Sequence, residues 1–461
     1  MRLVVIGSGP GGYVAALKAA QLGAEVTVIE ETEVGGTCLN RGCIPTKSLI
    51  ASTELYTKAR EMEKFGLDLD GAVKPNLARM MERKDKIVGI QVKGIRGLFK
   101  SWGVSIVEGR GALKGARSVE VRKKDGSTET LEADGVIIAT GSEPAEIKAF
   151  PFDAKTIINS THALGLTELP KSMLIVGAGV IGCEWACMFA ELGTEITMVE
   201  MLPRAVATED PEVSELLARE LKKKKIKLLT GTGVESVQVT GQGAVARLSG
   251  GKEVSAEKVL VSVGRALNSK NMGLEEAGVD VGKRGEIVVN ERMETTVEGV
   301  YAIGDVTGGI LLAHVASKEG IVAALNVCGK DAAMDYGTVA AAIFTSPEIG
   351  SVGLREHEAE QRGVKYRTGH FPFRALGKAH AMGEISGFFK LVADRETDRV
   401  LGAHIIGPHA SVLVHEAAVA MHNGLTVRDL ADTIHAHPTL SEGLMEAAED
   451  VHGEAIHAPR K

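Results

Sequence analysis

One pattern occurs twice in this chain, and it constrains the fold more than any other feature of the sequence. In the first copy, an apolar run at residues 3–6 enters a G-x-G-x-x-G turn, a helical pattern follows, and a second apolar run at 25–29 ends at Glu30. The glycines of this turn are Gly7, Gly9 and Gly12. A strand, a glycine turn, a helix and an acid about 20 residues on together predict a Rossmann unit that binds a dinucleotide.

The second copy keeps the same spacing. Its strands are at 174–176 and 195–199, and Gly177 and Glu200 each lie 170 residues after their counterparts Gly7 and Glu30. Its glycines are Gly177, Gly179 and Gly182. Glycine lets the backbone approach a pyrophosphate, the helix N-terminus favours the phosphate charge, and the acid accepts hydrogen bonds from a ribose. The alternative is two Rossmann-like units without nucleotides, and the complete context of both copies argues against it.

Length, charge and cysteine usage bound the class of protein. With 461 residues the chain is too long for one ordinary core, so three or four domains are expected. A net charge of −7 argues against nucleic acid as the main partner. Glycines interrupt the apolar start too early for a signal peptide, and no apolar run approaches the roughly 20 residues of a membrane span. Five cysteines, with one close pair suited to redox work, favour a reducing cytoplasm.

That close pair is Cys38 and Cys43, with four residues between them, just after the first nucleotide-binding pattern. Two thiols can hold two electrons as a disulfide, and a neighbouring flavin can pass those electrons on. Glycines at 35, 36 and 42 allow irregular backbone, and Pro45 is suited to open a helix. Helix amides together with Arg41 and Lys47 favour a thiolate. Two buried cysteines or half of a zinc site are the alternatives, but no second Cys/His pair of zinc spacing accompanies them.

The segment 35–47, GGTCLNRGCIPTK, resembles the redox-active segment of the class I flavin-dependent pyridine nucleotide-disulfide oxidoreductases. Other motifs are similar to the dihydrolipoamide dehydrogenase branch of that family, including 344–349, 405–410 and HPTLSE at 437–442. Two departures concern local packing rather than chemistry: relatives usually have a proline within 339–343 and a lysine at the position of Val315. The expected fold is α/β, with two Rossmann-like nucleotide-binding domains and a C-terminal α+β dimerisation domain.

Two cofactors are expected from the two units. The dithiol follows the first unit, which makes that unit the natural flavin site, and segments 136–141 and 299–305 would return to it. The resemblance implies FAD on Gly7, Gly9, Gly12, Glu30, Lys47, Thr140, Gly141, Gly304 and Asp305. It implies a nicotinamide cofactor on Gly177, Gly179, Gly182, Glu200 and Gly264. Because Glu200 would repel a 2′-phosphate, NAD is favoured over NADP, although Arg204 nearby points the other way.

Lys47 lies one helical turn after Cys43, which would let it reach the same flavin ring. The resemblance implies that Lys47 pairs with Glu184, at the start of the second-unit helix; ordinary helix surface is the alternative for both. Several other residues are expected to be structural: Cys183 and Cys187 in a core, Cys328 without a visible partner, and His314, His415 and His435.

The acid–base group is expected in the C-terminal motif. An imidazole has a pKa suited to take a thiol proton, so His437 is the candidate base, and Glu442 would hold one ring nitrogen and fix the tautomer. The resemblance implies that this base serves the active site of the other subunit. For the His-x-His at 435–437 the alternatives are a polar turn and metal binding, for which no third ligand is evident.

The chain is expected to contain four parts: an FAD-binding domain with a helical insertion at 1–148, a NAD-binding domain at 149–272, a central part at 273–338 and an interface domain at 339–461. The last part alternates strands at 387–392 and 400–406 with a helix at 411–422. An apolar face on this helix, comprising Val412, Val419 and Met421, predicts a subunit interface, and the resemblance implies a homodimer.

The resemblance implies oxidation of protein-bound dihydrolipoamide to lipoamide, with NAD reduced to NADH through a redox-active disulfide. Catalysis would involve Cys38, Cys43, Lys47, Glu184, His437 and Glu442. The implied partners are a lipoyl-bearing acyltransferase or a glycine cleavage carrier protein, with this chain as a shared subunit of 2-oxo acid dehydrogenase or glycine cleavage complexes. Two alternatives stay open: an NADPH-driven disulfide reductase similar to glutathione reductase, which Glu200 disfavours, and a flavoprotein whose main role is structural docking.

Overall fold

The computed structural model describes residues 1–459, and the chain divides into two compact units. The first unit contains Met1–Ile147, Asn159–Glu168 and Val263–Asp335, and the second contains Lys148–Ile158, Leu169–Ser262 and Tyr336–Lys461. The expected FAD-binding and central parts thus fall mostly in the first unit, and the expected NAD-binding and interface parts mostly in the second. The domain limits at 148, 272 and 338 stay predictions.

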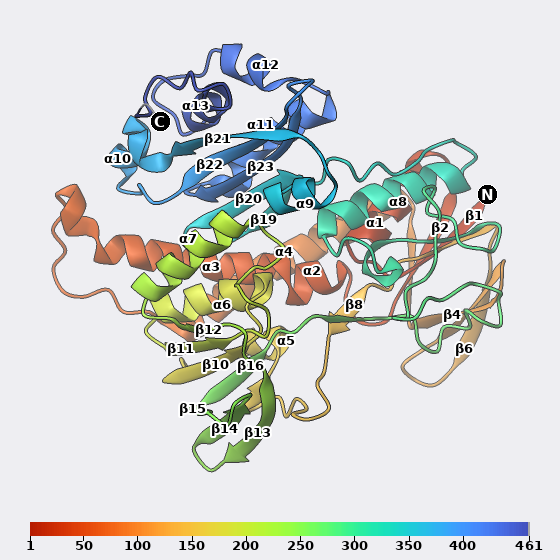
Figure 1. The fold of residues 1–461 in the computed structure, drawn as a ribbon. Helices are drawn as coiled ribbons and strands as arrows, with labels where there is room; N and C mark the ends of the chain where they lie inside the picture. Colours follow the sequence, from red (N-terminus) through yellow and green to blue (C-terminus); the bar gives the residue numbers. More distant parts are fainter. Residues whose placement is uncertain (460–461) are drawn as a thin grey trace. The chain divides into compact units, whose positions relative to one another are not determined.

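A five-stranded parallel sheet with the order β18-β7-β1-β2-β3 lies at the centre of the first unit (Figure 1). Its strands are β1 (Arg2–Ile6), β2 (Glu25–Glu30), β3 (Ser105–Glu108), β7 (Gly135–Ile138) and β18 (Val300–Ala302). Helices α1 (Pro10–Gln21) and α8 (Ala313–Val327) pack against each other and share one core with alternate sheet residues. The remaining sheet residues face a second core, which explains why these strands are almost continuously apolar.

Two additions complete the first unit. The helical insertion, expected over roughly Thr46 to Phe99, corresponds to α3 (Cys43–Arg60), η1 (Met62–Phe65) and α4 (Leu77–Ser101), and α2 (Gly36–Arg41) precedes it. A three-stranded antiparallel sheet covers the second core and consists of β4 (Arg110–Gly115), β5 (Ser118–Arg122) and β6 (Thr128–Glu132). A short ladder joins β8 (Ser142–Pro144) to β17 (Arg265–Leu267), and η2 (Gly304–Thr307) follows β18. Helix α5 (Ser160–Ala163) also belongs to this unit.

The second unit repeats the same sheet. Its parallel order is β12-β11-β10-β16-β9, which matches β3-β2-β1-β7-β18 strand for strand. The strands are β9 (Ile157–Ile158), β10 (Ser172–Val176), β11 (Glu195–Val199), β12 (Lys227–Leu229) and β16 (Lys258–Val261). Helices α6 (Val180–Glu191) and α7 (Pro211–Lys223) accompany it, with an antiparallel sheet of β13 (Val234–Thr240), β14 (Gly243–Leu248) and β15 (Glu253–Ala256). The prediction of two Rossmann-like units is confirmed.

An antiparallel sheet in the order β19-β20-β23-β22-β21 forms the C-terminal part of the second unit. Its strands are β19 (Ala341–Ile343), β20 (Glu348–Gly353), β21 (Tyr366–Pro372), β22 (Phe388–Asp394) and β23 (Val400–Gly407). Helices α11 (Ala410–His422) and α13 (Glu442–Asp450) pack with one face of the sheet in a single core. The remaining elements are α9 (Glu356–Gln361), η3 (Phe373–Ala375), α10 (Gly377–Met382) and α12 (Val427–Asp432). This mixed α+β arrangement confirms the expected fold class.

The expected apolar face of α11 is partly wrong. Val412 and Val419 are 68% and 62% exposed and lie on the same side of the helix, as their spacing of seven residues requires. Met421 lies two residues, or about 200°, further round the helix and packs against the sheet core. Of the three residues, Val412 and Val419 are therefore the two that share an exposed side of the helix.

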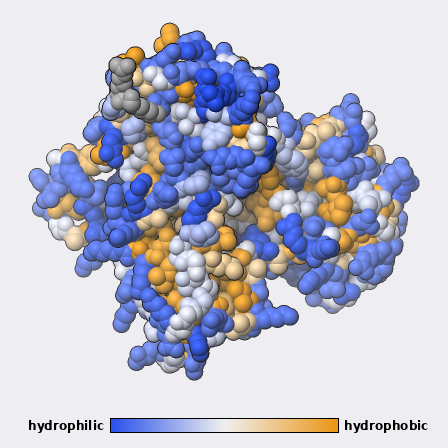
Figure 2. Space-filling model, viewed as in Figure 1, coloured by the Kyte–Doolittle hydropathy of each residue, from blue (hydrophilic) through white to orange (hydrophobic). Residues whose placement is uncertain are grey.

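Hydrophilic residues cover most of the face shown in Figure 2, and hydrophobic residues appear there in separate patches. Within residues 1–459, no helix has both the length and the apolar character that crossing a bilayer requires.

Gly12→Ala tests the contact that sets α1 against β1. A Cβ at this position would lie 2.0 Å from the Gly7 carbonyl oxygen, so the helix must shift, and we expect a loss of roughly 3 kcal/mol or more. Gly97→Ala in α4 is the matched control, because its Cβ would meet open space and alanine favours the helix by up to about 1 kcal/mol. Thermal melting should separate the two variants; equal melting temperatures would show that the close approach is not required.

Buried His404 on β23 predicts a loss of stability in acid. Burial lowers its pKa from 6.5 to about 4, against the opposing effects of the Leu354 carbonyl and Asp210. The unfolded chain therefore binds this proton near pH 6.5 and the folded chain only near pH 4, so stability is lost as pH falls through this window, by up to about 3 kcal/mol. The stability advantage over His404→Gln, measured by chemical unfolding, should shrink between pH 7 and pH 4. A constant difference would contradict a buried neutral imidazole.

Candidate functional site

The two cysteines of the redox segment lie on different helices that meet at a break. Cys38 is in α2, Cys43 is the first residue of α3, and Gly42 between them has φ −140° and ψ −109°. A side chain at Gly42 would lie 3.1 Å from the Thr37 carbonyl oxygen, so little room exists for any other residue. The side chains of the two cysteines are in hydrogen-bond contact. The geometry is that of a dithiol that can close to a disulfide.

Neighbouring groups shift the pKa of Cys38 in opposite directions. Contact with Cys43 raises the pKa of Cys38 far above its usual range, burial raises it further, and the charge of Lys47 only partly opposes them. The charge of Lys47 acts in the expected direction, toward a thiolate, but contact with Cys43 and burial outweigh it at Cys38. Cys43 lies at the N-terminus of α3, where the helix amides favour a negative charge.

The first glycine turn forms a compact anion site beside the redox helix. The backbone of Gly36 in α2 lies against Gly9, where an added Cβ would come within 2.5 Å of the Gly9 Cα. Glu30 is anchored to the same turn: its Oε2 accepts from the Ser8 backbone N at 2.9 Å and its Oε1 from the Thr32 backbone N at 2.9 Å. The Ser8 and Thr32 hydroxyls donate to the same two oxygens, at 2.6 and 3.1 Å, so both oxygens of the Glu30 carboxylate accept two hydrogen bonds within the chain. A ribose hydroxyl would take the place of one of these side-chain hydroxyls.

The two segments expected to return to this turn, 136–141 and 299–305, lie next to residues that make polar contacts. Asp305 accepts from the Ser142 hydroxyl, and Arg265 Nε lies 2.6 Å from Ser142 Oγ and 3.4 Å from Asp305 Oδ2. These contacts fix one oxygen of Asp305 and leave the other for a ligand. At Gly304, the backbone N donates to the buried Glu319 at 2.6 Å.

Thr140 and Gly141 are each held by a hydrogen bond from Asn268. The Asn268 side chain donates to the Thr140 carbonyl at 3.0 Å, and the Asn268 backbone N donates to the Gly141 carbonyl at 3.0 Å. All these residues belong to the first unit, as does Gly264, whose carbonyl accepts from the Ala145 N at 3.0 Å.

The second glycine turn has the same construction in the second unit. A Cβ at Gly182 would lie 2.0 Å from the Gly177 carbonyl oxygen, whereas one at Gly179 would meet nothing within 4 Å. That open space at the N-terminus of α6 suits a phosphate group. Glu200 accepts from the Ala178 N at 2.7 Å and from the Leu202 N at 2.8 Å, as Glu30 does in the first turn.

Arg204, the basic residue near Glu200, is already occupied. Its Nη2 donates to the carbonyl oxygens of Ala207 at 2.8 Å and Glu209 at 3.2 Å. A guanidinium engaged with the backbone is not directed toward a 2′-phosphate. Arg204 therefore does not argue for NADP.

The remaining catalytic candidates lie in different units. Glu184 in α6 is buried and accepts from the Phe344 N at 3.0 Å, within the second unit, whereas Lys47 is in the first. Their pairing stays a prediction. Cys183 and Cys187 are buried in α6.

His437 and Glu442 form a dyad in the second unit. The distance from His437 Nδ1 to Glu442 Oε1 is 2.8 Å, and the Thr439 N donates to Glu442 Oε2 at 2.8 Å. Burial opposes ionisation of Glu442, but these two hydrogen bonds prevail and lower its pKa. A carboxylate at Nδ1 fixes the proton there and leaves Nε2 as the basic nitrogen, on a side chain that is 78% exposed. The dyad therefore presents a base to an incoming molecule.

Among the described residues, no cluster of three or more His, Cys, Asp or Glu side chains is arranged to hold a metal ion. His435, the other half of the His-x-His, has its Nε2 2.6 Å from Glu416 and its Nδ1 2.8 Å from the Thr433 carbonyl. Both nitrogens thus make protein contacts, which fits the structural role expected for His435.

The sequence did not indicate Ser142, Arg265, Asn268 or Glu319. Ser142 and Arg265 directly follow the predicted residues Gly141 and Gly264, so proximity in sequence was the available signal. Glu319 offered no such signal, because it lies within an ordinary helical pattern 15 residues after Gly304.

Comparisons with known proteins point to the same family over nearly the whole chain. A family model described as pyridine nucleotide-disulphide oxidoreductase matches residues 1–320, and the dimerisation domain of that family matches residues 339–448. A dihydrolipoyl dehydrogenase of Thermus scotoductus is 45% identical over 461 residues, covering 99% of this chain and 98% of that protein. One of Chlamydia muridarum is 43% identical over 458 residues with the same coverage. Among solved structures, LpdA from Mycobacterium tuberculosis has a TM-score of 0.92 at 32% identity, covering 97% of this chain and 99% of that one.

Ser142→Ala tests the anchoring of Asp305. Loss of a hydrogen bond to a carboxylate costs about 1.5–3 kcal/mol, so the dissociation constant for FAD should rise roughly tenfold or more. Flavin titration of the apoprotein measures this, with the exposed Ser101→Ala as control. Unchanged flavin affinity would mean that Asp305 does not contact the cofactor.

Proposed function

This chain belongs to the pyridine nucleotide-disulphide oxidoreductase family, and we propose that within it the chain oxidises dihydrolipoamide with NAD as electron acceptor. The family resemblance inferred from the motifs is confirmed. The chain is a flavoprotein disulfide oxidoreductase that uses FAD and NAD, and its dimerisation domain makes it a homodimer. The substrate and the roles of individual residues are the proposal.

The observation that carries the proposal is the contact between Cys38 in α2 and Cys43 in α3, next to the point where Gly36 of α2 packs against the first glycine turn. The α1 N-terminus, Glu30 and Asp305 fit FAD in this unit, and the second turn, with open space at Gly179 and with Glu200, fits NAD. Bound FAD supplies the redox chemistry between the dithiol and NAD.

The protein's own residues then carry out thiol–disulfide exchange. His437 Nε2 takes the proton of one substrate thiol, and the resulting thiolate attacks Cys38 Sγ. The bond between Cys38 and Cys43 breaks, and Cys43 leaves as a thiolate. The second substrate thiol attacks the sulfur joined to Cys38, which forms the product disulfide and releases Cys38. The raised pKa of Cys38 suits this step, because Cys38 then takes up a proton while the electron pair stays on Cys43.

The His437–Glu442 dyad supports a base delivered from the partner subunit. The dyad lies in the part of the chain that contains the family's dimerisation domain, and the side chain of His437 is largely exposed. We place Nε2 against the substrate thiol in the other subunit's active site. Lys47 and Glu184 are proposed to pair near the flavin.

Two observations favour NAD over NADP. Both oxygens of Glu200 are oriented by backbone N–H groups toward the second turn, and Arg204 is engaged with carbonyl groups. They weigh against an NADPH-driven disulfide reductase. We further propose that the protein is cytoplasmic and that its macromolecular partner is a lipoyl-bearing acyltransferase or a glycine cleavage carrier protein.

Anaerobic reduction of the yellow protein with dihydrolipoamide, followed by NAD, tests this proposal. A long-wavelength absorbance band should appear on addition of the dithiol, because a Cys43 thiolate then lies beside the oxidised flavin, and NADH should form on addition of NAD. Reduction by NADPH alone, with no response to the dithiol, would contradict the proposed substrate and direction.

Cys43→Ser and Cys38→Ser separate the roles of the two thiols. Both variants should keep FAD, and both should lose dithiol oxidation by at least about 10³-fold, because neither can form the disulfide. In Cys38→Ser the remaining Cys43 thiolate should still produce the long-wavelength band, and in Cys43→Ser that band should be absent. Full activity in either variant would refute the dithiol mechanism.

A further inference from the structure

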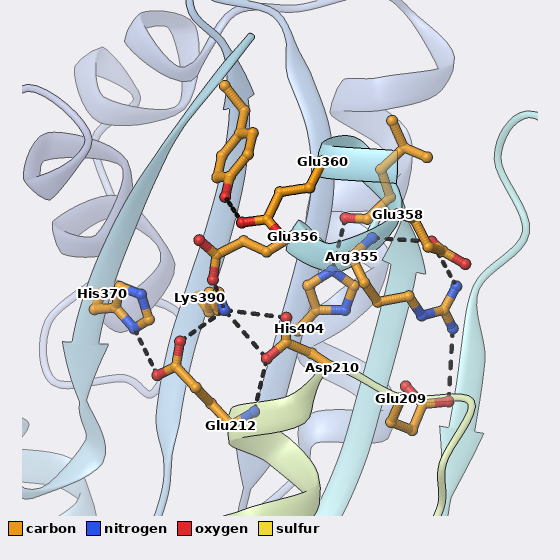
Figure 3. Close-up of polar contacts among 12 residues, drawn as sticks. Glu209, Asp210, Glu212, Arg355, Glu356, Glu358, Glu360, His370, Lys390 and His404 are labelled. Carbon is orange, nitrogen blue, oxygen red and sulfur yellow. Dashed lines mark hydrogen bonds and ion pairs between the residues drawn. The ribbon is translucent and has the colours of Figure 1, made fainter. Parts of the chain in front are cut away.

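A cluster of charged side chains with a buried centre lies where α7 meets the C-terminal sheet (Figure 3). At its centre is Lys390 on β22, whose Nζ lies 3.1 and 3.0 Å from the two carboxylate oxygens of Asp210 and 2.7 Å from Glu212 Oε1. The same amine also contacts Glu356 of α9. Lys390 is 1% exposed and Asp210 is fully buried. A buried cation with three carboxylates is costly to form and costly to break, so its position is firmly defined.

Lys390 stays charged in this cluster. Burial disfavours its ammonium form, but hydrogen bonds to Glu212 and Glu356 and the charge of Asp210 outweigh burial and raise its pKa. The lysine therefore acts as a permanent cation that fixes Asp210 at the N-terminus of α7, where Asp210 caps the helix by accepting from the Glu212 N at 3.0 Å.

From Asp210, a short series of hydrogen bonds reaches the second glycine turn. The Asp210 carbonyl accepts from the Ser214 N at 3.0 Å, and Ser214 Oγ donates to the Val206 carbonyl at 3.3 Å. The Val206 N in turn donates to the carbonyl of Ala178 at 2.8 Å. Ala178 lies between Gly177 and Gly179, so the cluster is connected to the turn that faces the nucleotide.

Segment 201–210, which contains Val206 and Asp210, makes a second contact with the C-terminal part of the unit, through Arg355. Arg355 Nη2 lies 3.6 Å from Glu209 Oε1, and the Glu209 N donates to the Val206 carbonyl at 2.8 Å. Arg204 closes the segment by donating to the Glu209 carbonyl. The stretch 201–210 has no helix or strand of its own, so these contacts determine its course.

We propose that Lys390 is a positioning residue for the nicotinamide nucleotide: it fixes Asp210 and, through segment 201–210, fixes the turn formed by Gly177, Gly179 and Gly182. The inference rests on the proposed function, in which this turn takes NAD. The C-terminal sheet thereby takes part in nucleotide binding without contacting the nucleotide. Loss of Lys390 should weaken the binding of NAD and NADH while the dithiol reaction keeps its substrate affinity.

Lys390→Met in the full-length holoenzyme tests the proposal. With Asp210 released, KM for NAD and the dissociation constant for NADH, followed by fluorescence, should both rise roughly tenfold, and KM for dihydrolipoamide should stay within about twofold. Lys390→Arg, which keeps the charge, should restore most of the NADH affinity.

Lys84→Met is the matched control, because Lys84 is also buried and donates to the Leu164 carbonyl at 3.0 Å within the first unit. It should lower the melting temperature without changing NADH affinity. A purely structural role for Lys390 would give the same result in Lys390→Met, and this outcome would overturn the proposal.

Ser214→Ala decides the question if Lys390→Met does not fold. This variant removes one hydrogen bond to Val206 and leaves the cluster intact, so NADH affinity should fall roughly threefold to tenfold. Unchanged affinity would refute the connection between Asp210 and the turn. Failure of the wild-type protein to reduce NAD with dihydrolipoamide would instead refute the proposed function, and NADH binding would still report on Lys390.

Discussion

Contact between the backbone of a helix and the backbone of the preceding strand end is the constraint on which the rest of the structure depends. It occurs at Gly12 over the Gly7 carbonyl and again at Gly182 over the Gly177 carbonyl, where a Cβ would lie 2.0 Å from the oxygen. This contact brings each helix N-terminus to the carboxyl end of its sheet, where phosphate charge is favoured. In the first unit it also leaves room for Gly36 to approach Gly9, which places the redox helix at the same turn.

The dithiol depends on a different local feature. A continuous helix from Gly36 to Arg60 would keep Cys38 and Cys43 on a regular spiral, but the break at Gly42 brings their side chains into contact. The same break makes Cys43 the first residue of a helix, where free helix amides favour a thiolate. One irregular residue therefore determines both the contact between the two thiols and the helix end at which Cys43 lies.

The sequence predicted what is local and missed what is distant. Strands such as β2 and β11 and the contact between His437 and Glu442 were anticipated because their spacing is short and periodic. Ser142 with Asp305 is separated by 163 residues and Lys390 with Asp210 by 180, so no single-sequence pattern connects them. Met421 was misplaced for a simpler reason: apolar character was counted without the helical angle.

Each acid at the end of the second strand is held by its own turn. Glu30 and Glu200 accept from Ser8 and Ala178, the residues that follow the first glycine, and from the residues two positions after themselves. In each unit, the carboxylate that we propose to bind a ribose is thus oriented by contacts within the chain. Preorganisation of this kind reduces the conformational entropy lost on binding. For the nucleotides proposed here, each unit thus offers a carboxylate whose direction is set by the chain itself.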